Sequence, residues 1–169
     1  MPPRNPVLNS AMNVWQRGTS VSATASNAYT ADRWQLAANT SQTCTVSRQA
    51  TGDTTNLPNI QYCARVQRNS GQTAIGAYAL AQSFESVNSI PFAGKVVALS
   101  FYARAGANFS STSSNMLVQL YSGTGTDQNL LTGFTGSNVV AANTATTLTT
   151  TWQRFTITGT VPALSLIHI

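Results

Sequence analysis

The side chains best suited to chemistry in this sequence are aromatic residues spaced two positions from arginine or glutamine. A sugar ring is bound by flat aromatic faces that stack on its C–H groups, flanked by planar hydrogen-bonding side chains. Three segments carry such pairs on the face opposite their apolar residues: Tyr102, Arg104, Gln119, Tyr121, Trp152 and Arg154. If these segments are neighbouring strands, the six residues form one carbohydrate-binding patch. In the structural alternative a second sheet packs on this face, or Tyr and Trp cap the core.

Catalytic chemistry has little support, because the chain holds four acidic residues and one histidine. Glycoside hydrolysis needs two carboxyl groups that face one cleft. Glu85 and Asp127 are the only candidate pair, and nothing in the sequence brings them together. A Ser-His-Asp arrangement would depend on His168, which lies in an atypical tail. We therefore predict a protein that is not an enzyme, and we keep a glycosidase or depolymerase domain as the catalytic alternative.

No cofactor is predicted. Zinc sites need four ligands, and neither a histidine nor a further cysteine lies near Cys44 and Cys63. These two cysteines could pair if adjacent strands carry them, but a protein made in a cytosol is expected to keep them as reduced thiols. Calcium could be held by Asp127 with Asn129, or by Asp53, and one carboxylate gives only a weak site. We expect no tight metal binding.

The composition indicates a globular chain whose polar surface carries few charges. Of its 169 residues, 42% are apolar and only 8% are charged, whereas about a quarter are charged in an average domain. With one Lys and one Glu, a helical bundle is not expected. The net charge of +5 comes mainly from scattered arginines, so no nucleic acid is predicted as a partner. No apolar run long enough to span a membrane and no secretory signal are recognised, so no membrane partner is predicted.

Short segments with period-two alternation predict the fold. In 95–106, Val97, Leu99 and Phe101 alternate with small or polar residues, as in a half-buried strand. We expect this strand to pair with 115–122, and we expect a long polar loop over 123–150. About eight strands are predicted in all: 12–16, 29–37, 43–49, 60–68, 73–84, 95–106, 115–122 and 151–161. Because no βαβ alternation is present, the fold class is all-β, an antiparallel β-sandwich or jelly roll.

The last seven residues, ALSLIHI, break this pattern. A sandwich should continue with one or two more strands after residue 162. We therefore expect a single β-sandwich domain over 1–163 that is missing its last strands, followed by a non-native or unstructured tail over 164–169. The alternative is that the gene simply ends there.

Four motifs, in this order and spacing, resemble a family of bacteriophage virion proteins from tail fibres and related structures. They are NVWQRGTS (13–20), YTADRWQL (29–36), FAGKVVALSFYARA (92–105) and TTWQRFTITGTVP (150–162). The resemblance covers nearly the whole chain up to residue 162. The domain of that family is similar to the carbohydrate-binding, galactose-binding-like jelly rolls attached to xylanases. The family continues with two further strands that are absent here.

The resemblance implies a non-catalytic virion protein made in the bacterial cytoplasm. Its partners would be a host-surface glycan and other virion proteins, and a homo-oligomer is expected. The implied alternative is an assembly or oligomerisation module of the virion that binds no sugar. Fold alone does not establish sugar binding.

Overall fold

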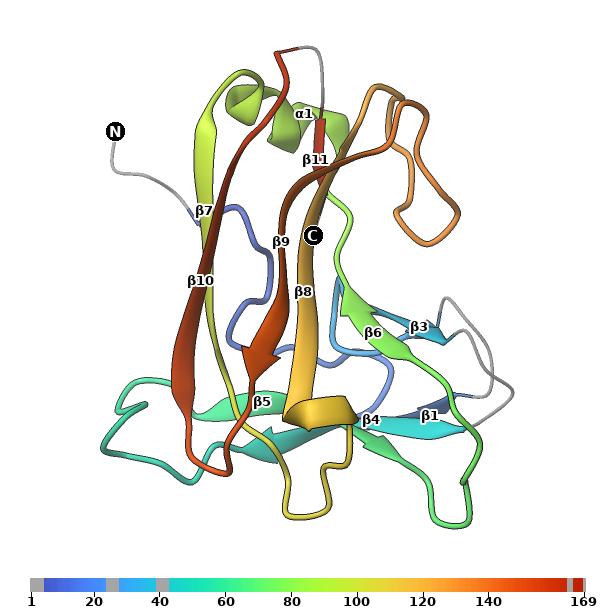
Figure 1. Cartoon of the computed structure of the whole chain (residues 1–169), viewed down its shortest axis with the longest axis vertical. Helices are drawn as coiled ribbons and strands as arrows, with labels where there is room; N and C mark the ends of the chain where they lie inside the picture. Colours follow the sequence, from blue (N-terminus) through green and yellow to red (C-terminus); the bar gives the residue numbers. More distant parts are fainter. Residues whose placement is uncertain (1–4, 24–27, 39–42, 164–165, 169) are drawn as a thin grey trace. The chain divides into compact units, whose positions relative to one another are not determined.

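Strands dominate the computed structural model of this chain, which describes residues 5–23, 28–38, 43–163 and 166–168 (Figure 1). Within those residues eleven strands form antiparallel sheets, and the predicted all-β class is confirmed. The helical segments described there are short: α1 (Ser86–Ser89), η1 (Ile90–Phe92) and η2 (Thr112–Ser114). None of the described helices has the length and apolar character that crossing a membrane requires. The chain divides into two compact units, Met1–Ser83 and Phe84–Ile169.

The first unit contains two three-stranded antiparallel sheets. In one, the order is β1 (Ser20–Ala23), β4 (Cys44–Ala50) and β5 (Tyr62–Arg68). In the other, the order is β2 (Ala28–Tyr29), β3 (Gln35–Ala38) and β6 (Tyr78–Ala81). The core of this unit is the fully buried trio Leu36, Cys44 and Val46, against which Trp15 and Tyr78 pack.

The two cysteines of this unit lie on neighbouring strands but far apart along them. Cys44 is opposite Arg68 and Cys63 is opposite Gln49, a separation of five positions in register. At a rise of about 3.3 Å per residue this distance is more than twice the limit for a disulfide. Neither Cys44 nor Cys63 takes part in a disulfide. Burial raises the pKa of the Cys44 thiol, which keeps it protonated and unreactive.

The second unit also contains two antiparallel sheets. One is the pair β7 (Val96–Ala103) and β10 (Gln153–Thr160). The other places β8 (Asn115–Gly123) between β9 (Asn138–Thr147) and β11 (Leu166–His168). The predicted pairing of 95–106 with 115–122 is therefore wrong, because among the described strands β7 pairs with β10 instead.

The β7–β10 pair has two distinct faces, as the alternation predicted. Burial along β7 alternates strictly between exposed and half-buried residues. The inner face carries Val97, Leu99 and Phe101 from β7, and Phe155, Ile157 and Gly159 from β10. The outer face carries the exposed residues Ala98, Ser100, Tyr102, Arg154, Thr156 and Thr158.

The second sheet of this unit approaches the inner face at a glycine. A Cβ added to Gly159 would overlap the Val140 carbonyl oxygen and lie 3.0 Å from the Ala141 Cβ. Ala141 is buried and pairs with the buried Leu120 of β8. Glycine at this position therefore lets the backbone of β9 approach β10 closely and brings the two sheets face to face there.

Four local predictions are wrong. Within the predicted strand 29–37, residues 30–34 are not strand and separate β2 from β3. Residues 12–16 form no strand, because Met12 adopts a left-handed turn and its N–H bonds the Asn9 carbonyl at 3.0 Å. Of 73–84, only the four residues of β6 are regular strand. The expected loop over 123–150 contains the ten-residue strand β9. The Val and Thr residues of β9 favour extended backbone, but its many Asn and Ala residues weaken the alternating hydrophobic pattern that predicts a strand.

That residues 1–163 form a single domain remains a prediction. That the tail over 164–169 is non-native also remains a prediction. Leu166–His168 form β11, which pairs with residues Tyr121–Gly123 of β8, so these three residues have regular structure. The remaining tail residues, 164, 165 and 169, lie outside the described residues.

Candidate functional site

Four of the six residues predicted to bind carbohydrate lie together at one end of the outer face of the β7–β10 pair. Arg154 is directly opposite Tyr102 in the register. Continuing the register by one pair sets Arg104, just after β7, opposite Trp152, just before β10. We refer to Tyr102, Arg104, Trp152 and Arg154 as the outer cluster.

The outer cluster alternates aromatic and cationic side chains. Tyr102 and Trp152 are diagonal neighbours, and so are the two arginines. Opposed residues have Cβ atoms about 5 Å apart and residues two positions along a strand are about 7 Å apart. The cluster therefore covers an area on the scale of one or two sugar rings.

Each residue of the outer cluster has a defined environment. The Tyr102 side chain is 40% exposed, and both arginines are exposed. The Arg104 Cζ atom lies 5.3 Å from the centroid of the half-buried Trp152 ring, within range of a cation–π contact. The exposed ring of Tyr102 is therefore accessible to a ligand.

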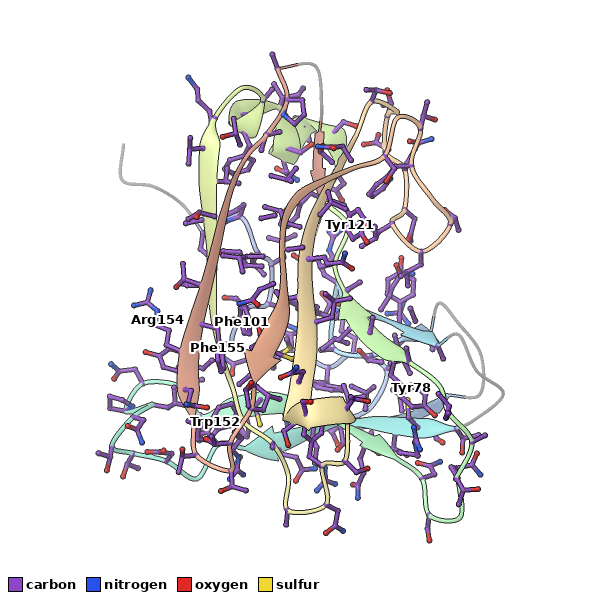
Figure 2. All side chains as sticks on the ribbon, in the orientation of Figure 1. Tyr78, Phe101, Tyr121, Trp152, Arg154 and Phe155 are labelled. Carbon is purple, nitrogen blue, oxygen red and sulfur yellow. The ribbon has the colours of Figure 1, made fainter. Side chains whose placement is uncertain are left out.

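Ser100, which the sequence analysis did not name, holds Arg154 in position. The Arg154 Nη2 atom donates a hydrogen bond of 3.0 Å to the Ser100 hydroxyl. Ser100 precedes Tyr102 by two positions on the same face of β7, opposite Thr156. The period-two pattern places Ser100 on this face, but only the pairing of β7 with β10 brings it within reach of Arg154. Figure 2 shows Arg154 projecting outward from β10.

The inner face holds the outer cluster in register. Phe101 and Phe155 are directly opposite each other, with ring centroids 5.7 Å apart and planes inclined by 29°. Such a stacked aromatic pair contributes about 1 kcal/mol beyond its area burial. Each phenylalanine lies next in sequence to a residue of the outer cluster, so their contact fixes how Tyr102 and Arg154 oppose each other.

The other two predicted residues, Gln119 and Tyr121, lie on a different sheet. The Tyr121 hydroxyl donates a 2.9 Å hydrogen bond to the Gln119 Oε1 atom. They alternate along β8 with Leu120, whose partner Ala141 faces Gly159 on the inner side of β10. Gln119 and Tyr121 therefore face away from the β7–β10 pair. Figure 2 shows Tyr121 and Trp152 toward opposite ends of the strands. The six residues do not form one continuous patch, and the predicted carbohydrate binding by each remains a prediction.

The two carboxylates weighed for hydrolysis come closer than the sequence indicated. Asp127 Oδ1 accepts a 2.7 Å hydrogen bond from the Ser86 N–H, and the Ser86 hydroxyl accepts one of 2.8 Å from the Asp127 N–H. Ser86 is the neighbour of Glu85, whose Oε2 accepts from the Asn88 side chain at 2.9 Å. The Ser86 backbone and side-chain hydrogen bonds lower the pKa of Asp127. A general acid in glycoside hydrolysis needs the opposite shift.

The oxygens considered for calcium take part in loop hydrogen bonds. Asp53 Oδ1 accepts from the Thr55 and Asn56 N–H groups at 3.0 and 2.8 Å. Asn129 Oδ1 accepts from the Leu131 N–H at 2.8 Å. The part of the chain that the structure describes has no group of three or more His, Cys, Asp or Glu residues that could hold a metal ion.

Comparison with known proteins adds no relative to this picture. No protein family, no curated protein and no solved structure matches the chain.

Proposed function

We propose that this chain is a non-catalytic structural protein of a bacteriophage virion, of the tail fibre or another tail component, and that it binds a glycan of the host surface through the outer cluster. The four motifs of the sequence support the virion class and a carbohydrate-binding jelly roll. The observation that carries the binding proposal is the exposed Tyr102 ring, set directly opposite Arg154 on an exposed sheet face.

The chemistry of this pair suits a sugar. A pyranose ring can lay its C–H face on the phenol ring of Tyr102, while guanidinium N–H groups donate to its ring and hydroxyl oxygens. Because Tyr102 and Arg154 lie on the paired strands β7 and β10, their backbones lose little conformational freedom when the sugar binds. No turnover is required, and binding serves adhesion.

The test is a glycan array probed with the full chain and with Tyr102→Ala. Loss of the stacking ring should weaken binding by about tenfold, which corresponds to about 1.4 kcal/mol. Tyr29→Ala is the matched control, because Tyr29 is also an exposed tyrosine with an arginine near it, the Arg17 Cζ atom lying 4.8 Å from the ring centroid. Circular dichroism establishes that both variants remain folded.

Binding by the full chain and by Tyr29→Ala, with loss in Tyr102→Ala, supports the proposal. Equal loss in both variants, or equal retention, contradicts the assignment of the site. No binding of the full chain to any glycan contradicts the function itself.

A specific observation favours an assembly role as the second candidate. Leu117 on β8 and Val139 on β9 are 56% and 45% exposed, and both lie on the side of their sheet that carries Tyr121. Apolar side chains that gather on one exposed sheet face can form a contact surface between proteins. Light scattering discriminates: a stable homo-oligomer that binds no glycan would favour an assembly module.

A further inference from the structure

The outer cluster carries two arginines, and the described residues of its own unit, 84–163 and 166–168, pair neither of them with a carboxylate. Residues 84–169 contain two acids, Glu85 and Asp127. Glu85 accepts a hydrogen bond from Asn88 of α1, and Asp127, in the loop between β8 and β9, accepts one from Ser86 of α1. Among the described residues, Arg154 has the Ser100 hydroxyl as its side-chain partner, and Arg104 has the Trp152 ring. Two cationic side chains therefore share an exposed face on which the described residues of the second unit place no acid.

The geometry leaves donors for an anionic ligand. A guanidinium has five N–H donors in a planar fork, and the contact with Ser100 uses one of those of Arg154. The hydrogen bond restrains the guanidinium at Ser100, which lies two positions from Tyr102 on the same face of β7. The stack on Trp152 restrains Arg104 in the same way and leaves the edge of its guanidinium available. Trp152 thus acts as a positioning residue for Arg104, and Tyr102 is the ring accessible for stacking.

The two arginines are matched to a carboxylate more than to a neutral hydroxyl. Arginine forms paired, parallel hydrogen bonds to a carboxylate, and such charge-assisted bonds are about twice as strong as neutral ones. A sugar ring on Tyr102 would bring a carboxylate on that ring, or on the next one, to Arg154 or Arg104, since the cluster spacing is about 5–7 Å.

We infer that the glycan recognised by the outer cluster is acidic, with a carboxylate on the sugar that meets Arg154 and Arg104. The inference rests on the proposed function and specifies its ligand class. It predicts selectivity for carboxylated over neutral glycans, and a dependence on salt, because charged contacts at an exposed face are screened.

The experiment uses the full chain and immobilised sialylated and uronic-acid oligosaccharides, each beside its own carboxyl methyl ester. The carboxylated forms should bind at least about tenfold more tightly than their esters. This difference in affinity should become smaller when NaCl is raised from about 50 to about 500 mM, because the Debye length then falls roughly threefold. Arg154→Gln should lose most of this preference, because a neutral amide cannot form a charge-assisted hydrogen bond to the carboxylate.

Arg65→Gln is the matched control. Arg65 is an exposed arginine on β5, opposite Ser47, so its substitution makes the same change in net charge at a residue that is not part of the outer cluster. It should leave the preference for carboxylated glycans intact. Equal loss in Arg65→Gln and Arg154→Gln would reduce the effect to net charge and would overturn the inference.

The remaining outcomes separate the inference from the proposed function. If neutral glycans and methyl esters bind as tightly as the carboxylated forms and depend on Tyr102, the function stands and the acidic ligand is wrong. If no oligosaccharide of either kind binds, both are wrong.

Discussion

The two faces of the β7–β10 pair are built from the same strands, yet they have opposite chemistry. The inner face holds stacked phenylalanines, aliphatic side chains and a glycine that admits a neighbouring strand. The outer face holds exposed threonines, serine, arginines and an accessible tyrosine ring. Because side chains alternate between faces, one strand pair can provide stability on one side and recognition on the other. Substitutions on the inner face should therefore act on folding, and those on the outer face on binding.

The largest effect is expected at Gly159. Gly159→Val would place atoms on the Val140 carbonyl and push β9 from β10, and overpacking of this kind costs about 3 kcal/mol. Gly106→Val is the control, because a Cβ at Gly106 meets nothing within 4 Å and its φ is not in the left-handed region. Urea unfolding should show a large fall in midpoint for the first variant and a small change for the second. Equal midpoints would disprove the close approach of the two sheets.

A smaller loss is expected from Phe155→Ala. The side chain is half-buried and stacks on Phe101, so truncation should cost about 2 kcal/mol, below the range for fully buried phenylalanine. Thr156→Ala, at the adjacent exposed position, should change the free energy of unfolding by less than about 0.5 kcal/mol. The same denaturant titration measures both variants. Similar losses in the free energy of unfolding would show that the two faces do not differ in their contribution to stability.

The smallest effect on stability is expected from the hydrogen bonds between Asp127 and Ser86. Their contribution depends on pH, whereas that of the apolar inner face does not. The folded-state pKa of Asp127 is lowered by its hydrogen bonds to Ser86. Its stabilisation is therefore present above the unfolded-state pKa of about 3.9 and is lost as the pH falls through the folded-state value.

The measurement compares the unfolding midpoints of the parent chain and Asp127→Asn between pH 7 and pH 2.5. The parent should be the more stable at pH 7, and the difference should shrink in acid. Phe155→Ala serves as the control, since its deficit should not follow this titration. A constant difference between parent and Asp127→Asn would show that the carboxylate charge plays no part.

Local alternation made much of this molecule predictable. The apolar residues of 95–106 and 151–161 recur at every second position, so both strands and both of their faces could be assigned from sequence. The same rule put Tyr102, Arg104, Trp152 and Arg154 on the outer face. It failed for β9, whose Ala, Asn and Thr residues carry weak hydrophobic periodicity, and for 12–16, where hydrogen bonds of the Asn9 side chain to Val14 stabilise a turn.

Which strands pair, and in what register, was decided by the tertiary structure. The sequence by itself determined the all-β class, the sidedness of β7 and β10 and the side chains available for recognition, because these depend on neighbours along the chain. It assigned β8 as the partner of β7, and so grouped Gln119 and Tyr121 with residues of another sheet. Pairing depends on contacts between residues far apart along the chain, such as Arg154 with Tyr102. No local pattern encodes those contacts, since any two amphipathic strands present similar edges to each other.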